Sequence, residues 1–538
     1  MAPHDPLEDK AARMVMIDLP GPQLDADSRR HVASAPWGGL VLFSKNIESR
    51  PQVAQLLEDF HQACPARALV AVDQEGGLVD RFRFEEMSNS PGNMALAATG
   101  DEELTRRAYR IMATELADLG VDLDFAPCLD VNCNPENPII GVRSFGEDPD
   151  QVSRHGRAAI EGLRQGGVGA TAKHFPGHGD TSQDSHIALP TLPHGRDRLE
   201  RVELAPFRAA VEAGVEAIMT AHVTFPALDP SEGLPATLSR PVLSGLLRQA
   251  MGYRGVIATD SLSMKAISDH FGQEEAAVKA VEAGADLILA LGPPSQQVAI
   301  VRALVQAVRH GRLTEARLDE SLGRLSRLWA GFRNQPAARP RWDVAAHREE
   351  MAEIAARGIT LVRNQEGLLP ARPGPDDEIL VLAPDVLPVS PLGEVSLRVP
   401  LAPWLRAEGA ARVQERLFNL ATAGPPVGEL TGAARQASLV VLALYGRNRL
   451  PDPQKELARA IIEANPHTVV VSLSSPYLLM DVPQAPAYVC AYNYGPLSLQ
   501  ALARVLLGRR QPGGRLPVSL PGLYPAGHGL GFGASVAG

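Results

Sequence analysis

The chain has 538 residues, which at roughly 100–200 residues per domain favours two or three domains. Hydrophobic residues make up 45% of it and charged residues 21%, as in an ordinary globular protein. The formal net charge of −10 argues against a nucleic-acid partner, because phosphate contacts need clustered Lys and Arg, and no apolar stretch of about 18 residues is present to span a membrane.

The chain begins with MAPHDPLEDK, a polar segment without the apolar core of a signal peptide. Its four cysteines have no CxxC spacing, so they predict buried thiols in a reducing compartment rather than a disulfide framework. The two observations together predict a cytoplasmic protein. The cysteines are Cys64, Cys128, Cys133 and Cys490.

Eight short apolar runs follow, and each ends in polar residues or glycine. Near-continuous apolar runs are typical of strands that are buried on both faces of a parallel sheet. Charged segments of helical period separate them, such as DEELTRRAYRIMATELADLG at 101–120. This alternation predicts an α/β fold of the (β/α)8, TIM-like barrel type, with an open doubly wound sheet as the alternative. The runs begin at residues 12, 38, 68, 121, 167, 215, 255 and 284.

Polar side chains stand at or just past the carboxyl ends of these predicted strands. In a barrel of this type the active site lies on that face. Several such residues on one rim predict a polar pocket there. They are Asp73, Asp130, Lys173, His174, His222 and Asp260.

The segment KHFPGHGDTSQDSH, residues 173–186, carries one Lys, three His and two Asp. His174 and His178 are four residues apart, which on a helix is the spacing of a metal-binding pair. Pro176, Gly177 and Gly179 interrupt any helix, so we expect a loop over the barrel mouth and no metal site. The two glycines would allow such a loop to close over a ligand.

Two carboxylates have both a chemical and a structural interpretation. Asp184 stands two residues before His186, and in a loop its carboxylate can hydrogen-bond the imidazole and favour the charged form, as in catalytic dyads. A capping Asp beside a surface His is the alternative. Asp260 ends an apolar run and is either a nucleophile at the pocket floor or a helix N-cap.

The segment AVDQEGGLVDRF offers groups that could bind hydroxyls. Asp73 can accept a pair of hydrogen bonds from neighbouring hydroxyl groups, while Arg81 and Arg143 provide forked donors. A structural ion pair is the alternative interpretation for each Arg.

Helical segments near 295–332 close the first half, and the Pro- and Arg-rich NQPAARPRW at 334–342 has the composition of a linker. Strand-like runs then resume, separated by helical stretches. We therefore predict a barrel domain at 1–333, a linker at 334–349 and a smaller α/β domain at 350–538. The runs of the second domain are GITLVRN, EILVLAP, ASLVVLALYG, HTVVVSLSS and APAYVCAY.

Four motifs together resemble glycoside hydrolase family 3: AVDQEGG, IIGVRSFGEDP, KHFPGHGDTSQDSH and GVIATDSLSM. The third is similar to a motif of the family's bacterial β-N-acetylglucosaminidases, which its β-glucosidases lack. The resemblance covers most of residues 12–332, and the part from ARGITLVRNQEGLLP to GGRLPVSLPG resembles the family's second domain. This branch implies a retaining, exo-acting enzyme without cofactors, which removes terminal β-linked N-acetylglucosamine (GlcNAc) in peptidoglycan recycling.

The resemblance also implies the roles of single residues. Asp260 matches the nucleophile of a double displacement, and Asp184 and His186 match an acid/base dyad on a mobile loop. Most other family members take their acid/base Glu from the second domain, so here that domain is implied to be structural or to affect aglycone access. The residues that match the binding site of the terminal sugar are Asp73, Arg81, Arg143, Lys173 and His174.

Several alternatives stay open. Leu78 stands where this branch usually has Arg, which bears on the aglycone preference. A neutral imidazole adds no repulsion toward an anionic nucleophile, so phosphorolysis is an alternative to hydrolysis. A β-glucosidase, a metal hydrolase and a sugar-binding protein are further alternatives, although the intact Asp260, Asp184 and His186 argue against the last. The expected partner is a small carbohydrate or muropeptide, and nothing in the sequence predicts the oligomeric state.

Overall fold

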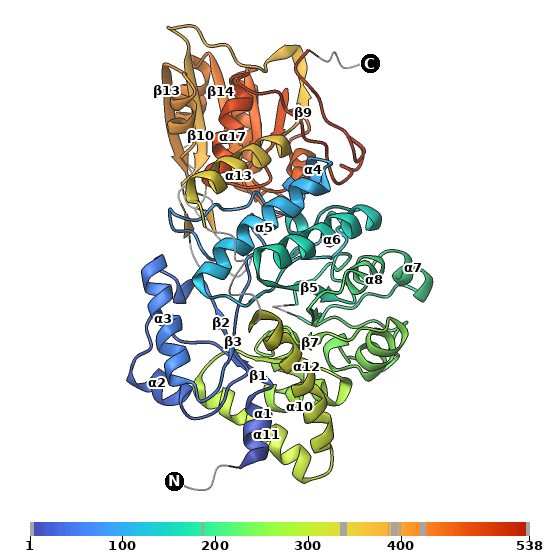
Figure 1. The fold of residues 1–538 in the computed structure, drawn as a ribbon. Coiled ribbons are helices and arrows are strands. Elements are labelled where there is room, and N and C mark those ends of the chain that lie inside the picture. The colour runs from blue at the N-terminus through green and yellow to red at the C-terminus, as the bar shows by residue number, and fades with distance from the viewer. Residues whose placement is uncertain are drawn as a thin grey trace.

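The computed structural model describes residues 5–185, 188–333, 342–385, 387–388, 396–397, 400–419 and 427–533. These residues form two large sheets with their own helices, which lie one above the other along the long axis of the molecule, and one small two-stranded sheet (Figure 1). The first sheet, blue to green in that view, occupies the lower part, and the second sheet, orange to red, occupies the upper part.

The first sheet has eight strands that pair in parallel in the order β7-β6-β5-β4-β3-β2-β1-β8. A bridge between Ala258 and Leu287 joins its two ends, where the Thr259 N–H donates to the Leu287 carbonyl at 2.9 Å. The sheet therefore closes, which confirms the predicted TIM-like barrel over the open sheet. Every strand residue is buried, as expected for strands packed between a filled barrel interior and a ring of helices. The strands are β1 Val15–Ile17, β2 Gly39–Leu42, β3 Leu69–Val72, β4 Leu123–Asp124, β5 Gly169–Phe175, β6 Ala217–Thr220, β7 Val256–Ala258 and β8 Ile288–Ala290.

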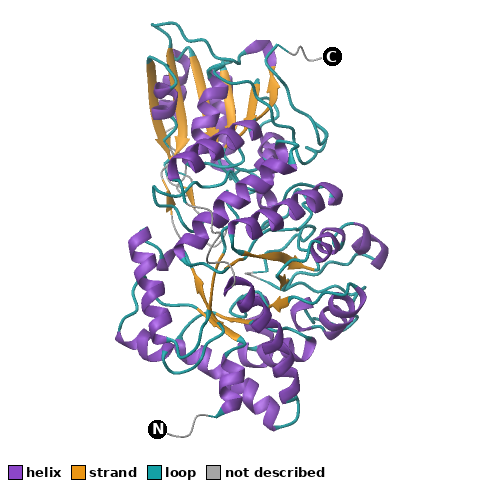
Figure 2. Cartoon of the chain, viewed as in Figure 1, coloured by secondary structure: helices purple, strands orange, loops and turns teal. Residues whose placement is uncertain are grey.

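Helices surround this barrel (Figure 2). The helix predicted at 101–120 forms as α5, capped by the Asp101 side chain at one end and by Gly120 in the left-handed conformation at the other. Within the described ranges no helix has both the length and the apolar composition needed to cross a membrane. The helices are α1 Pro6–Ala12, α2 Ala26–Val32, α3 Arg50–Ala63, α4 Asn93–Ala98, α5 Glu102–Leu119, α6 Pro149–Gly166, α7 Arg196–Arg201, α8 Ala205–Glu212, α9 Lys265–Phe271, α10 Gln273–Ala283, α11 Pro294–Arg309 and α12 Glu315–Arg333, with short 3-10 helices η1 Ser44–Asn46, η2 Gly141–Arg143 and η3 Ala236–Leu238 and a π-helix η4 Pro241–Ala250.

The second sheet has six strands in the order β13-β10-β14-β15-β16-β9, all paired in parallel except β9, which runs antiparallel at one edge. This confirms the smaller α/β domain. Its strands are β9 Thr360–Asn364, β10 Glu378–Pro384, β13 Arg412–Phe418, β14 Leu439–Leu444, β15 Thr468–Ser472 and β16 Ala487–Cys490, beside a separate pair, β11 Leu387–Pro388 and β12 Ser396–Leu397. Its helices are α13 Val344–Gly358, α14 Ala402–Ala407, α15 Val427–Gln436, α16 Asp452–Ala464 and α17 Pro496–Leu506, with turns η5 Gln365–Gly367 and η6 Pro476–Asp481.

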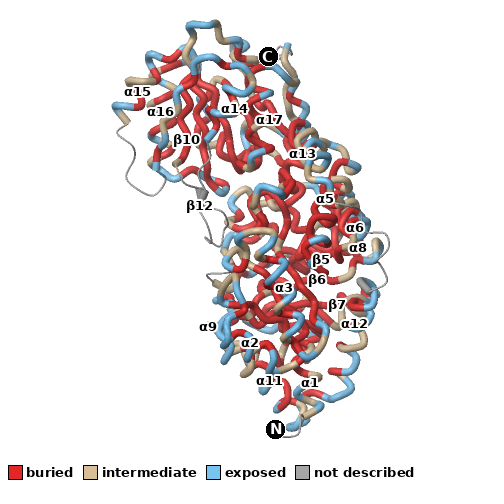
Figure 3. Tube along the Cα trace, turned by 60° about the vertical axis from the view of Figure 1, so that its left-hand side comes forward, coloured by how far each residue is buried: buried red, intermediate tan, exposed pale blue. Residues whose placement is uncertain are grey.

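The second domain rests on barrel segments that follow β3 and β4. Figure 3 shows buried chain on both sides of this junction. Asn132 donates to the Tyr477 hydroxyl at 3.1 Å, and the Ser519 hydroxyl donates to Glu147 at 2.6 Å. Because β3 and β4 deliver their carboxyl ends here, the second domain stands beside the predicted barrel mouth. The barrel also contributes apolar side chains to the core of the second domain: Leu78, Met94, Ala95, Ala98 and Val142.

Two earlier expectations bear on this junction. Leu78 lies in the shared core with 8% of its surface exposed, so its side chain fills the junction rather than the rim of a pocket. Of the predicted linker at 334–349, residues 334–341 lie outside the described residues, and α13 already begins at Val344. The domain boundaries at 333 and 350 stay a prediction.

Candidate active site

The ends of the barrel strands carry the predicted polar residues. Asp73 directly follows β3, while Lys173 and His174 are among the last three residues of β5, at its end toward the mouth. His222 and Asp260 each stand two residues beyond the ends of β6 and β7. All of these strands are parallel, so their side chains meet at one rim.

A buried charge cluster links the loops after β3 and β4 to β5. The Lys173 ammonium lies 2.6 Å from the Asp73 carboxylate and 2.7 Å from that of Glu75. The Arg143 guanidinium donates two hydrogen bonds, of 2.7 and 2.9 Å, to the two carboxylate oxygens of Glu75. The Arg81 guanidinium lies 3.8 Å from the Asp73 carboxylate. The structure therefore brings four of the five predicted sugar-binding residues together around Glu75, which the sequence analysis did not single out.

The cluster stays charged although it is buried. Burial alone would raise the pKa of Glu75, but the charges of Arg143 and Lys173 outweigh it and hold that pKa at about 2. Burial would likewise lower the pKa of Lys173, but the Asp73 and Glu75 carboxylates raise it above its ordinary value. The Asp73 side chain is 19% exposed and that of Glu75 only 1%, so Asp73 is the carboxylate of the cluster that a ligand can reach.

His174, the fifth predicted sugar-binding residue, is held by Asp130. Its Nδ1 lies 2.7 Å from the Asp130 carboxylate, which also accepts the backbone N–H of His178 at 2.6 Å. Burial opposes ionisation of Asp130, but the His174 imidazole and its hydrogen bond keep the pKa of that carboxyl well below its usual range. The carboxylate fixes the orientation of the imidazole ring relative to the barrel mouth.

The segment after β5 is a loop, as predicted, and its first half is pinned to the barrel. His178 bridges two hydroxyls, with Thr181 Oγ1 at 2.7 Å from its Nδ1 and Ser185 Oγ at 3.0 Å from its Nε2. Burial lowers the pKa of His178 to about 4, so the ring is neutral near pH 7. The Asn137 amide donates to the carbonyls of His178 and Gly179 at 2.8 and 2.9 Å. These bonds give His178 a structural role within the loop.

A second anchor holds the loop at Asp180. His194 Nε2 lies 2.7 Å from the Asp180 carboxylate, and Arg198 lies 3.5 Å from it. Arg198 also contacts Glu203 at 2.6 Å and the Cys133 sulfur at 3.2 Å. Cys133, Asp180 and Glu203 have the spacing of a metal-binding group, but the guanidinium occupies the space among them.

Of the predicted acid/base pair, Asp184 lies at the end of this loop. His186 lies outside the described residues. The Asp184 side chain is 9% exposed, and its carboxylate makes an ion-pair contact of 3.6 Å with Arg447, which belongs to the second domain. The second domain therefore reaches the predicted dyad, a contact that the sequence did not predict.

Asp260 lies in the connection between β7 and α9. Its carboxylate accepts the Ser261 N–H at 2.7 Å. Helix α9 begins at Lys265 with Met264 as its N-cap, so the alternative of Asp260 as a helix cap is wrong. His222 Nε2 contacts the Ser261 carbonyl at 2.9 Å, which ties the loop after β6 to the residue next to Asp260.

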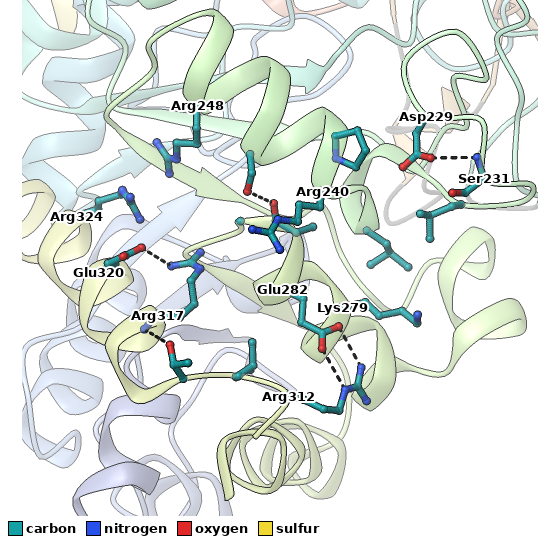
Figure 4. Close-up of a pocket in the computed structure, with 18 residues that line it drawn as sticks. Asp229, Ser231, Arg240, Arg248, Lys279, Glu282, Arg312, Arg317, Glu320 and Arg324 are labelled. Carbon is teal, nitrogen blue, oxygen red and sulfur yellow. Dashed lines mark hydrogen bonds and ion pairs between the residues drawn. The ribbon is translucent and has the colours of Figure 1, made fainter. Parts of the chain in front are cut away.

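A hollow of about 780 Å³ lies elsewhere, beside η4, α10 and α12 (Figure 4). It borders the segment that leads into β7, because Arg248 donates to the Gly255 carbonyl at 2.6 Å. Its wall is rich in Arg, but Arg248, Arg317 and Arg324 share the buried carboxylate of Asp286. These cations stabilise the barrel base, and we place no reaction there.

Family models match both parts of the chain. Residues 6–328 match the Glycosyl hydrolase family 3 N terminal domain, and residues 359–523 match the Glycosyl hydrolase family 3 C-terminal domain. The two matches correspond to the closed barrel and to the six-stranded sheet with its helices.

Individual relatives extend over most of the chain. Beta-hexosaminidase A of Pseudoalteromonas piscicida is 31% identical over 560 residues, which cover 94% of this chain and 92% of that protein. A beta-hexosaminidase of Xanthomonas oryzae pv. oryzae is 36% identical over 324 residues, which cover 59% of this chain and 94% of that protein. Among solved structures, a glycoside hydrolase family 3 beta-N-acetylglucosaminidase from Paenibacillus sp. str. FPU-7 is 39% identical, has a TM-score of 0.89, and is matched over 96% of this chain and 99% of its own.

Proposed function

The chain belongs to glycoside hydrolase family 3, and from that membership we propose that it is a retaining exo-β-N-acetylglucosaminidase acting on terminal β-linked GlcNAc. The observation that carries this proposal is the likeness, over nearly the whole of both chains, to a solved β-N-acetylglucosaminidase at 39% identity. The loop with Asp184 and His186 and the carboxylate of Asp260 are the groups that this reaction requires.

Asp260 is the nucleophile in this proposal. Its carboxylate oxygen attacks the anomeric carbon and forms a glycosyl ester while the bond from that carbon to the leaving oxygen breaks. The Ser261 N–H donates to this carboxylate at 2.7 Å and orients it, and strand β7 fixes the backbone two residues before it. A position just beyond a barrel strand is where such a group is held most firmly.

His186 is the proposed acid and base. As imidazolium it gives its proton to the leaving oxygen in the first step, and as neutral imidazole it takes a proton from the water that attacks the ester in the second. An unperturbed imidazole is mostly neutral at pH 7, since its reference pKa is about 6.5. The carboxylate of Asp184 stabilises the charged donor form.

Asp73 is the proposed acceptor for hydroxyls of the terminal sugar. The Lys173 ammonium donates to one of the Asp73 oxygens at 2.6 Å, so the carboxylate is already oriented before a ligand arrives. Arg143 and Lys173 both bind Glu75, so fewer of their hydrogen-bond donors face a ligand. In this proposal a large part of their role is therefore to position the cluster. His174, held by Asp130, completes the proposed sugar-binding set with Arg81.

We extend the proposal to the wider context that the sequence predicted. The substrate is a small carbohydrate, and muropeptide fragments of peptidoglycan are the proposed source. The proposed location is the cytoplasm, and the proposed division is a catalytic barrel at 1–333, a linker at 334–349 and a second domain at 350–538.

The deciding test compares nitrophenyl β-N-acetylglucosaminide with nitrophenyl β-glucoside in phosphate-free buffer. We expect a strong preference for the acetylated sugar and free GlcNAc as product. Preference for the glucoside would keep the mechanism and change the substrate, and a glycosyl phosphate formed only after phosphate is added would identify a phosphorylase. Binding of both sugars without turnover would reject the enzyme proposal.

A further inference from the structure

The connection between β14 and α16, residues 445–451, is the part of the second domain that contacts the loop with the proposed acid/base dyad. We propose that Arg447 in this connection is a positioning residue that holds the Asp184 carboxylate for its partner imidazole, so that proton transfer depends on the docked second domain. This inference rests on the proposed function of Asp184 and His186.

The connection is fastened to the barrel at several points around Arg447. Arg447 itself donates to the Pro138 carbonyl at 3.1 Å, and the buried Asn448 amide donates to the Asn137 carbonyl. The side chain of Asn137 in turn bonds the carbonyls of His178 and Gly179 in the catalytic loop. The second domain is therefore linked to this loop along two routes, through Asn137 and through the Arg447–Asp184 ion pair.

The connection is also held within its own domain. Gln454 bonds both backbone groups of Tyr445, as donor at 2.7 Å and as acceptor at 3.3 Å. The Ser474 hydroxyl donates to the Gly446 carbonyl at 2.6 Å. The backbone on both sides of residue 447 is therefore already ordered in the folded protein. Holding the guanidinium beside Asp184 costs little further backbone entropy.

The contact has an electrostatic consequence. The Asp184 carboxylate, which is 9% exposed, has the Arg447 guanidinium beside it, and Arg447 keeps 45% of its side chain exposed. In the proposed dyad the same carboxylate also stabilises the imidazolium of His186. Removing the guanidinium takes a positive charge away from the dyad, so the His186 imidazolium should persist to higher pH. Other charged or titratable groups stand on the elements that contact this part of the loop: His178, Glu136, Arg449 and Lys265.

The test compares Arg447→Ala with Arg447→Lys in the full chain. For Arg447→Ala we expect kcat/KM on an aryl GlcNAc with a poor leaving group to fall about tenfold, because a loosely held acid transfers its proton less often. On nitrophenyl GlcNAc, which needs little protonation, we expect less than about a twofold loss. The basic limb of the pH profile should move up by roughly half a unit in Arg447→Ala and return toward the wild-type position in Arg447→Lys.

Arg449→Ala is the matched control. Arg449 lies two residues further on the same connection and bonds Glu136 of the barrel at 2.8 Å, so its loss also removes an interdomain ion pair but leaves Asp184 untouched. We expect it to leave the rates on both substrates and the pH profile unchanged, since Glu136, its partner in the barrel, is exposed and Asp481, its second partner, lies within its own domain. Equal effects of the two substitutions would show general loosening of the junction and would overturn the role of Arg447.

His186→Ala and Asp184→Asn separate this inference from the proposed function. If these variants lose activity selectively on poor leaving groups while Arg447→Ala behaves as wild type, the dyad stands and the inference fails. If His186→Ala affects good and poor leaving groups equally, the proposed dyad itself is wrong. A double variant, Asp184→Asn with Arg447→Ala, should lose no more than Asp184→Asn alone, because both changes act through one carboxylate.

Discussion

Asp260 is the residue on which covalent double displacement depends. We expect Asp260→Ala to lower kcat on nitrophenyl GlcNAc by on the order of 10⁴-fold or more, because no other group would form the covalent bond to the sugar. Azide should enter the vacated space on the same face of the sugar and yield the α-glycosyl azide. A glycosyl azide of β configuration would contradict the assignment of Asp260, and Asp260→Asn serves as the control for charge alone.

Glu75 carries the pH dependence of the buried cluster. Its folded-state pKa of about 2 is below the ordinary value of 4.5, so its ionisation stabilises the fold above about pH 4.5, and this contribution is lost as pH falls toward 2. Glu75→Gln leaves Lys173 and Arg143 with less compensation, and we expect a loss of about 3 kcal/mol in the free energy of unfolding near pH 7.

Chemical unfolding of both proteins between pH 7 and 3 checks this expectation. The difference in stability between wild type and Glu75→Gln should shrink as pH falls below about 4.5, because Glu75 then takes up a proton in the unfolded wild-type chain while it stays ionised in the folded one. A constant difference over this range would mean that Glu75 contributes by shape and hydrogen bonding rather than by charge.

At the scale of elements, the catalytic loop is shaped by a glycine with no room for a side chain. A Cβ at Gly179 would overlap the Val131 carbonyl in the segment after β4. We expect Gly179→Ala to displace the loop and to lower kcat/KM by about 10–100-fold, since a shift of roughly 1 Å in a reacting group has that effect. Gly195→Ala, where nothing lies within 4 Å of the new Cβ, should retain wild-type activity. Equal activity of both variants would show that the loop tolerates displacement.

The elements that the sequence predicted are those with a strong apolar pattern. All eight barrel strands were found because both faces of each are buried, which leaves an unbroken apolar run. Strand β13 was missed because it lies at the sheet edge, where only Val413 and Phe418 of RVQERLF are buried and three of the seven residues are charged. Between β5 and β6 the chain forms two short helices, α7 and α8, and Pro206 stands in the first turn of α8.

The site was predictable to the extent that its residues end strands or share a motif. Glu75 could have been found, since it stands two residues after Asp73 in the same motif. Arg447 could not, because it follows a strand of another domain and no local pattern distinguishes it from other surface arginines. Its relation to Asp184 arises only from the docking of two separately formed sheets.

At the scale of the whole molecule, docking of the two domains explains Leu78. This residue follows AVDQEGG in the barrel, yet its side chain belongs to the core of the second domain and is 8% exposed. An Arg there would bring a charge into an apolar junction. We therefore expect Leu78→Arg in the full chain to reduce the free energy of unfolding by on the order of 3 kcal/mol.

The same substitution should also weaken catalysis indirectly, because a loosened junction displaces Arg447 from Asp184. Leu78→Met, which preserves volume and apolar character, is the control and should cost less than about 1.5 kcal/mol. Urea unfolding of the three proteins, followed in parallel with turnover of a poor-leaving-group GlcNAc substrate, measures both effects. If Leu78→Arg unfolded with wild-type stability, the junction would have to open readily, and the second domain could not hold the catalytic loop through a fixed contact.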